Sequence, residues 1–340
     1  MHFDLNTIWF ILVGVLFTGY AMLDGFDLGI GALHLFTKTD AERRIMLNSI
    51  GPVWDGNEVW LVTGGGALFA AFPSVYATAF SGFYLALYLL LAALIFRAVA
   101  IEFRSKRPER WWRQAWDIGF SAGSILSGLL IGTALGNIAW GVPIDANGEF
   151  AGTFLGLLTP YPLLVGVTTV ALFMMHGAIY GVMKTEHELH DKLRRWAMRC
   201  IIFFVICAVT TTMATLLYAP HIADRVRQNP WLFSIALANM LSIANIPREF
   251  HHKRDGFAFL SSCATMITLM ALFALDAYPN LIYSWPHPED SLSIYNSSSS
   301  PKTLGIMLVI ACIGMPIVIA YTICIYRIFH GKVKIDRMSY

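Results

Sequence analysis

The stretch LLLAALIFRAVAI, residues 89–101, contains one charged side chain, Arg97, in an otherwise apolar run. With the apolar residues that precede it, the run reaches the roughly 20 residues that a helix needs to cross a membrane. A charged group at membrane depth is rare and usually pairs with an opposite charge or faces a polar cavity. The stretch therefore predicts a transmembrane helix and raises the question of which acidic side chains accompany Arg97.

The whole chain shares this apolar character. Of its 340 residues, 56% are hydrophobic and only 14% are charged, whereas soluble domains contain about 25% charged residues. This composition predicts a polytopic membrane protein. The formal net charge of +2 gives no indication of a nucleic-acid partner. The N-terminus, MHFDLNT, lacks the basic region of a cleavable signal peptide, so we expect the first apolar segment to be retained.

Apolar segments of spanning length recur along the chain and predict an all-α fold of about nine transmembrane helices. The connections between them are too short to form a soluble domain, so residues 1–340 are expected to be one membrane domain. The predicted spans are 8–34, 55–72, 75–101, 115–137, 156–182, 196–219, 230–247, 257–278 and 303–328.

Basic residues are concentrated on alternate connections. Most of the 24 Lys and Arg residues lie in segments 36–54, 102–114, 183–195 and 248–256 and in the C-terminal tail. Because cytoplasmic loops carry an excess of Lys and Arg, we expect the N-terminus to lie outside and the C-terminus in the cytoplasm.

Acidic residues gather at the predicted cytoplasmic ends of the first two spans, in the motifs DGFD (24–27) and WDGNEVW (54–60). Within each motif the two acids are three residues apart, so they share one face of a helix. An antiparallel hairpin would bring both pairs, and the arginine of the third span, to a similar depth. Groups that gain and lose protons in a low dielectric are what a proton relay requires. The predicted proton pathway comprises Asp24, Asp27, Asp55, Glu58, Arg97 and, next to Asp55, Trp54.

A purely structural interpretation stays open for the same acids. Asp55 and Glu58 are first-turn residues, which a helix N-terminus stabilises by about 0.3–1 kcal/mol each. Asp24 and Asp27 fit half-solvated interfacial residues that pair with Arg97. We interpret Asp117, at the start of another span, as interfacial in the same way.

Two histidines, His34 and His176, lie within or beside predicted spans and are weak candidates for haem ligands. No metal site is predicted. Two other classes of function stay open: a membrane cytochrome that uses these two histidines, and a proton-coupled secondary transporter. Transporters usually show paired repeats and broken helices at the midplane, and neither is visible in the sequence.

Three stretches carry a resemblance to a known family. GYAMLDGFDLGIGAL (19–33), the long segment from ERRIMLNSIGPVWDGNEVW to SGFYLAL (42–87), and IFRAVAIEFRSK (95–106) together resemble subunit II of cytochrome bd-type quinol oxidases. The similarity is nearly continuous over residues 10–142. The length of the chain and its motifs also resemble those of the cyanide-insensitive branch of the family. Some members carry Gln at the position of Glu58, so the role of this residue transfers least well.

The resemblance implies one subunit of a complex in the bacterial cytoplasmic (inner) membrane that oxidises quinol and reduces oxygen to water without pumping protons. Two haems b and one haem d would reside in the larger partner, subunit I, and this chain would ligate none. The family's proton-conducting acids correspond to Asp27 and Asp55, and its arginine to Arg97. The resemblance also implies contact with membrane lipid, and it is compatible with small single-helix accessory subunits and a bound quinone.

Overall fold

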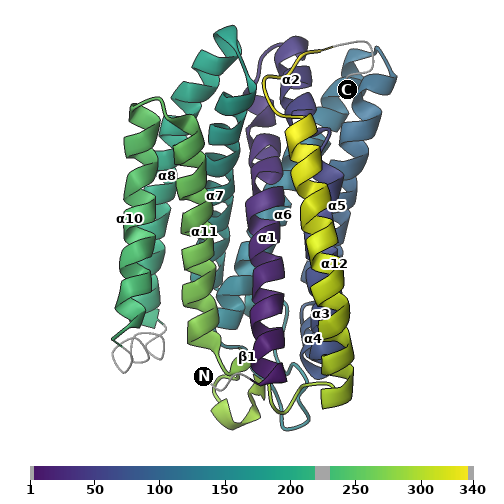
Figure 1. Cartoon of the computed structure of the whole chain (residues 1–340), viewed down its shortest axis with the longest axis vertical. Helices are drawn as coiled ribbons and strands as arrows, with labels where there is room; N and C mark the ends of the chain where they lie inside the picture. The colour runs from purple at the N-terminus through teal and green to yellow at the C-terminus, as the bar shows by residue number, and fades with distance from the viewer. Residues whose placement is uncertain (1–3, 219–229, 336–340) are drawn as a thin grey trace.

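The structure is a computed structural model that describes residues 4–218 and 230–335, and these residues are almost entirely helical. Long helices run along one direction, and the two ends of the chain lie at opposite ends of the bundle (Figure 1). The long helices are α1 (Leu5–Leu33), α3 (Trp54–Ala71), α5 (Tyr84–Phe103), α6 (Arg110–Trp140), α7 (Pro160–Lys184), α8 (His187–Tyr218), α10 (Leu232–His251), α11 (Asp255–Ala277) and α12 (Pro301–Ile328). The short elements are α2 (Asp40–Ile50), α4 (Pro73–Gly82), η1 (His34–Phe36), η2 (Arg104–Lys106), η3 (Leu155–Leu157), η4 (Pro288–Asp290), β1 (Asn280–Ile282) and β2 (Leu292–Ser293).

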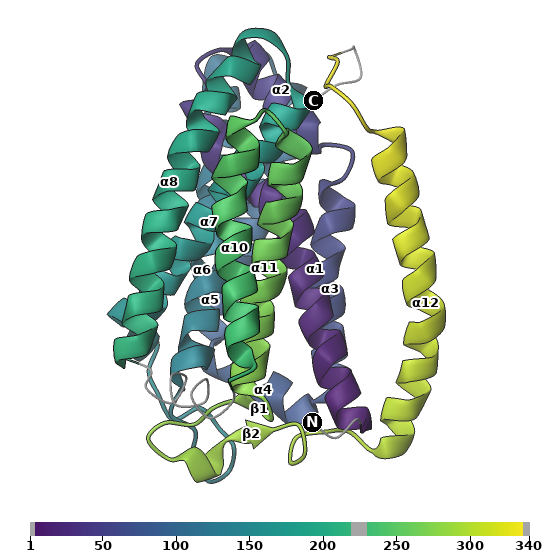
Figure 2. The same cartoon turned by 60° about the vertical axis from the view of Figure 1, so that its left-hand side comes forward.

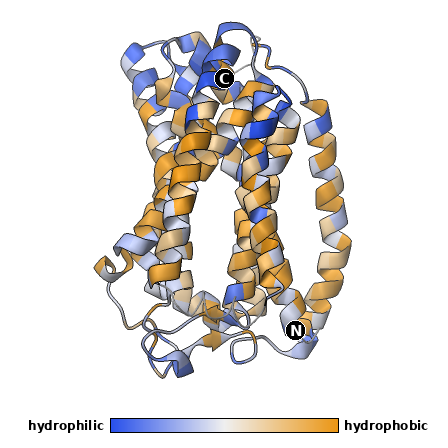
Figure 3. Ribbon diagram, turned by 90° about the vertical axis from the view of Figure 1, so that its left-hand side faces the viewer, coloured by the Kyte–Doolittle hydropathy of each residue, from blue (hydrophilic) through white to orange (hydrophobic). Residues whose placement is uncertain are grey.

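The predicted all-α membrane fold is confirmed. Seven segments of the described residues are long and apolar enough to cross a membrane, and α3 and α10 occupy the two remaining predicted spans. Figure 3 shows hydrophobic residues along the length of the helices and hydrophilic residues gathered at the end of the bundle where the C-terminus lies. We call this the basic end, because the connections 36–54, 102–114, 183–195 and 248–256 lie there (Figure 1). Its cytoplasmic location stays a prediction.

Several predicted spans differ from the observed helices: α6 begins at Arg110 rather than at 115, and α10 ends at His251 rather than at 247. The segment 75–101 is divided at Phe83 into α4 and α5, and α7 begins at Pro160 rather than at 156. The helix that corresponds to the predicted span 196–219 is longer than predicted, because α8 already begins at His187. Residue 219 lies outside the described residues. The first turns of α8 are polar, so hydropathy alone does not detect the part of the helix that projects beyond the apolar core.

The division at Phe83 has a local cause. Gly82, the last residue of α4, has a low helix propensity. It also packs tightly, because a Cβ atom there would lie 2.6 Å from the side chain of Phe150. The chain therefore turns where the loop after α6 presses against it.

The short helix α2 was not predicted, although its sequence carries a clear start signal. The Thr39 side chain accepts a hydrogen bond from the backbone of Glu42, and the Glu42 carboxylate accepts one from the backbone of Thr39, which is a capping box. Partial burial would raise the pKa of Glu42, but hydrogen bonds from Lys192, Lys38 and Thr39 lower it below its ordinary value. The carboxylate of Glu42 thus connects α2 to the start of α8.

An apolar cluster forms at the end of the bundle opposite the basic end. There β1 and β2 pair antiparallel, with Asn280 opposite Ser293 and Ile282 opposite Leu292. Ile282 and Leu292 pack with Trp9, at the start of α1. Helix α12 lies on the outside of the bundle next to α1 and α3 (Figure 2). The short sheet and its loops close the bundle at this end.

Close contact between α1 and α7 holds the centre of the bundle together. A Cβ atom at Gly29 would collide with the backbone carbonyl of Phe173, and one at Gly177 would lie 2.6 Å from the carbonyl carbon of Gly29. Small residues of this kind let membrane helices approach until their backbones touch. The depth of α1, and of the acids that it carries, is therefore fixed against α7.

We expect Gly29→Ala to lower the melting temperature of the purified protein in detergent, with a loss of about 1–3 kcal/mol from overpacking. Gly14→Ala is the matched control, because a Cβ atom at Gly14 meets nothing within 4 Å. The control should be neutral or stabilise the helix by about 0.5–1 kcal/mol. Equal melting temperatures for the two variants would contradict the close contact.

Candidate functional site

Arg97, on α5, is the centre of a buried charged cluster at the basic end of the bundle. Its side chain has no solvent exposure. Its Nη2 donates a hydrogen bond to Oδ1 of Asp24, on α1, at 2.6 Å, and its Nη1 donates to Oδ2 of Asp24 at 3.4 Å. A two-pronged contact between a guanidinium and a carboxylate is a strong and directional form of ion pair.

Two more carboxyl groups face the same guanidinium. Oδ2 of Asp27 lies 4.0 Å from Nη2 of Arg97, and Oε2 of Glu58 lies 3.7 Å from Nη1. Asp24 and Asp27 are fully buried, whereas the side chain of Glu58 is 20% exposed. One guanidinium balances one carboxylate, and uncompensated charge in a low dielectric is costly. The cluster is therefore electrically neutral only when it also binds protons.

Asn57 and Tyr326 extend the cluster toward α12. The side-chain amide of Asn57 donates to Oδ2 of Asp27 at 2.8 Å and to the carbonyl of Leu23 at 3.2 Å. The hydroxyl of Tyr326 donates to Oδ1 of Asn57 at 2.9 Å. Oδ1 of Asp27 has no hydrogen-bond partner among the described residues. A continuous chain of polar groups thus leads from Tyr326 to a carboxyl oxygen that is free to carry a proton.

Asp55 and Trp54 lie at the edge of this cluster rather than within it. Asp55 is in the first turn of α3, one turn before Glu58, and is exposed. It forms no ion pair with any cation in the described part of the chain. Trp54 is half-buried and packs against the apolar core of the basic end. The structure thus brings together four of the six predicted residues and places Asp55 at the surface next to them.

Sequence reasoning missed Asn57 and Tyr326. Asn57 lies within WDGNEVW, and its position between the two acids of that motif was a usable signal. Tyr326 is separated from Asn57 by 269 residues, and no local pattern of the sequence connects the two.

The expectation that Asp117 is interfacial was wrong. Its side chain is fully buried. Oδ1 accepts a hydrogen bond from Nε of Arg104 at 2.5 Å and lies 2.6 Å from Nε2 of His34, and Oδ2 accepts from Nη1 of Arg43 at 2.6 Å. The two arginines belong to connections that looked exposed in the sequence, but they fold back over the ends of α1 and α6. Arg104 also donates to Asp40, on α2, at 2.8 Å.

A haem ligand needs a free ring nitrogen, and His176 has none. Nε2–H of His176 donates to the carbonyl of Met22 at 3.0 Å, and its Nδ1 lies 2.6 Å from Oγ of Ser262. Nε2 of His34 is bound to Asp117, whereas its Nδ1 is buried and has no hydrogen-bond partner among the described residues. In the described part of the chain, no group of three or more His, Cys, Asp or Glu residues could hold a metal ion.

A cavity of about 340 Å³ adjoins the cluster between α1, α7, α11 and α12. Its wall is mostly apolar and aromatic, with Phe26, Tyr180, Phe259 and Tyr326 among the lining residues. Lys184 lines the same cavity and donates to the carbonyl of Phe329 at 2.7 Å. Tyr326 belongs both to this wall and to the chain of polar groups, so the cavity is linked to Asp27 through Tyr326 and Asn57.

Comparison with known proteins identifies the family. The model of the cytochrome bd terminal oxidase subunit II family matches residues 5–329. The chain belongs to this family. It is 38% identical to the cytochrome bd-I ubiquinol oxidase subunit 2 of Escherichia coli over 98% of this chain and 96% of that protein. It is 34% identical to the cytochrome bd ubiquinol oxidase subunit 2 of Bacillus subtilis over 97% of each.

A solved structure shows the same fold. The bd oxidase from Geobacillus thermodenitrificans superposes with a TM-score of 0.79 at 16% identity, over 96% of this chain and 98% of that chain. The chain is therefore a multi-pass membrane subunit of a haem-containing oxidoreductase complex that also has a subunit I. The resemblance noted in the sequence is confirmed over nearly the full length.

Asp117→Asn should destabilise the complex by up to about 3 kcal/mol, because it removes the buried carboxylate that pairs with Arg104 and Arg43, while Arg104 keeps only its contact with Asp40. The melting temperature of the purified complex measures this effect. Glu289→Gln, at an exposed position of the opposite end, removes one carboxylate and should leave the melting temperature unchanged. A similar melting temperature for both variants would show that the network around Asp117 does not stabilise the fold.

Proposed function

We propose that this chain brings protons from the cytoplasm to a haem-bearing subunit I that reduces oxygen to water with electrons from quinol. The complex would lie in the bacterial cytoplasmic membrane, and subunit I would hold two haems b and one haem d. Family membership supports the assignment to an oxidase complex. The observation that carries the proton route is the set of three carboxyl groups around one buried guanidinium, because such a set binds protons inside the membrane.

The chemistry requires a proton supply. Reduction of one oxygen molecule to two water molecules consumes four electrons and four protons. If the protons come from the cytoplasm and quinol releases its protons on the other side, turnover charges the membrane without a pump. The predicted cytoplasmic location of the basic end places the carboxyl cluster on the side from which protons would be taken.

Each residue has a role in this route. Exposed Asp55 accepts a proton from water at the start of α3. Glu58, which is partly exposed and faces Arg97, passes it into the buried cluster. Asp27 carries it on its unpartnered oxygen, while Arg97 holds Asp24 as the ionised partner and Asn57 orients Asp27.

The haems are assigned to the partner because the resemblance to the family implies it, and because both ring nitrogens of His176 are occupied by contacts within this chain. The aromatic cavity beside Tyr326 is the part of the described structure best suited to a bound quinone, because quinone rings stack on aromatic side chains and accept hydrogen bonds from hydroxyl groups. Small single-helix accessory subunits would pack against the exposed apolar faces of the outer helices.

A proton-coupled transporter is less well supported. Transporters of this kind usually have a helix that is broken at the midplane next to the substrate site. Among the described residues, the helices that carry the acidic cluster are not broken near it. The one divided span breaks at Phe83, separated from the basic end by the 20 residues of α5, or roughly 30 Å of helix. The break is therefore remote from the acids.

We expect Asp27→Asn and Asp55→Asn to slow steady-state oxygen uptake by the purified complex. For Asp27 the loss should approach about 100-fold, the lower range for a positioned proton-transfer group. The reduced-minus-oxidised haem spectra should be unchanged, because no haem ligand is altered. Glu289→Gln is the control for loss of a carboxylate outside the route.

A solvent isotope effect provides a second measurement. If proton delivery limits the slowed variants, the ratio of uptake rates in H₂O and D₂O should be larger for Asp55→Asn than for the wild type. Full turnover in both variants, with an unchanged isotope effect, would exclude this route.

A further inference from the structure

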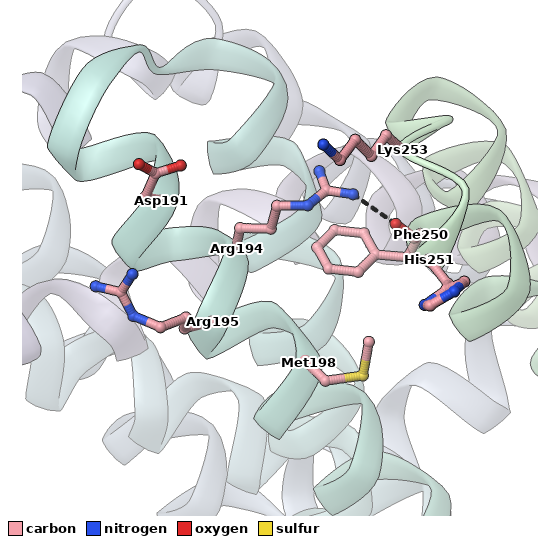
Figure 4. Close-up of a pocket in the computed structure, with 7 residues that line it drawn as sticks. All are labelled: Asp191, Arg194, Arg195, Met198, Phe250, His251 and Lys253. Atoms are coloured by element: carbon pink, nitrogen blue, oxygen red, sulfur yellow. Dashed lines mark hydrogen bonds between the residues drawn. The ribbon is translucent and has the colours of Figure 1, made fainter.

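A second cavity, of about 400 Å³, opens at the surface of the basic end, away from the carboxyl cluster. It lies between the first turns of α8 and the connection from α10 to α11 (Figure 4). Arg195 lines one rim, and Lys253 and His251 line the other, as Figure 4 shows. Met198 and Phe250 contribute apolar surface between them. The cavity therefore combines cations on two rims with an apolar floor.

Arg194 forms part of the wall of this cavity, and its charge is occupied by contacts within the chain. Its Nη1 donates to Oδ1 of Asp255 at 2.7 Å, its Nη2 donates to the carbonyl of Phe250 at 2.5 Å, and its guanidinium lies 4.4 Å from the centre of the Phe250 ring. These contacts hold the α10–α11 connection against α8. Asp191 is the one carboxylate that lines the cavity, and it does not balance both Arg195 and Lys253.

Lys253 occupies a backbone position that normally favours glycine. Its φ angle is +60°. Its N–H donates to the carbonyl of Phe250, and the N–H of Arg254 donates to the carbonyl of Glu249, which together form the turn that ends many helices. Glycine is the usual residue at this position because side chains strain the left-handed conformation. A lysine here sacrifices some stability of the turn and places a cation at the rim of the cavity.

The cations lie directly above an apolar surface. Arg199 is exposed one turn after Arg195 on α8, and exposed Ile202 and Ile206 follow on the same helical face. Phe257, in the first turn of α11, is 61% exposed. A strip of positive charge followed by apolar side chains matches the order of phosphate and acyl chain in a membrane lipid.

We propose that this cavity binds the phosphate of an anionic phospholipid, with Arg195 and Lys253 contacting the headgroup from opposite rims. The acyl chains follow the apolar surfaces of α8 and α11 into the membrane. The lipid is favoured over a free phosphate ion because the charged groups lie at the end of apolar spans and the floor of the cavity is apolar. This function is independent of the proton route.

The test uses the intact oxidase complex, stripped of lipid in detergent, and titrates its melting temperature with dioleoyl phosphatidylglycerol. The double variant Arg195→Gln/Lys253→Gly removes two cations, and glycine suits the turn, so the fold should be preserved. We expect its apparent affinity for phosphatidylglycerol to be weaker by roughly 10- to 30-fold. The control, Lys106→Gln/Arg110→Gln, removes two exposed cations from the same end and should bind as the wild type does.

Two further arms separate the lipid from other ligands. Dioleoyl phosphatidylcholine and inorganic phosphate should not protect the wild-type complex, and raised salt should weaken its binding of phosphatidylglycerol. Equal affinities in the two double variants would overturn the site. Protection by inorganic phosphate alone, or binding that is insensitive to salt, would overturn the assignment to a lipid.

Discussion

The ion pair between Arg97 and Asp24 is the constraint on which the arrangement of the first helices depends. A guanidinium with no solvent exposure requires a carboxylate at hydrogen-bond distance, because water cannot compensate its charge. This requirement fixes α5 against α1. Asn57, which donates to Asp27 and to the backbone of α1, fixes α3 in turn. The rotation of three apolar helices, which hydrophobic packing alone specifies weakly, is thus set by polar contacts.

The basic end contains two buried clusters of charged side chains, one around Asp117 and one around Arg97. They differ in the balance of positive and negative charge, and this difference suits the first to a structural role and the second to a functional one. Around Asp117, one carboxylate is surrounded by Arg43, Arg104 and His34. This network has no carboxyl group to spare, so it suits a permanent clamp between α1, α2 and α6. Around Arg97 the carboxyl groups outnumber the cation, and that surplus suits a site that loads and releases protons.

The sequence predicted the elements of the site better than their pairing. The acids of DGFD and WDGNEVW, and Arg97, could be placed at one depth because span lengths and helical spacing are local properties. Pairing of Arg97 with Asp24 and Asp27 was predicted, but which of the two forms the close contact was not, since it depends on the rotation of each helix about its axis. The hydropathy of the spans likewise gave no indication of α2 or of the buried position of Asp117, because both depend on contacts between connections. Tyr326 reaches the site only through tertiary packing.

Solvation changes in steps along the proposed proton route. Asp55 is exposed, Glu58 is 20% exposed, and Asp27 is fully buried. The tight contact between Gly29 and α7 prevents α1 from shifting outward to solvate Asp27. Each step inward therefore makes an ionised carboxylate less favourable, so a proton that reaches the interior is held until a stronger demand removes it. Consumption of protons during oxygen reduction in the partner subunit would supply that demand, which is how this chain would contribute to the reaction.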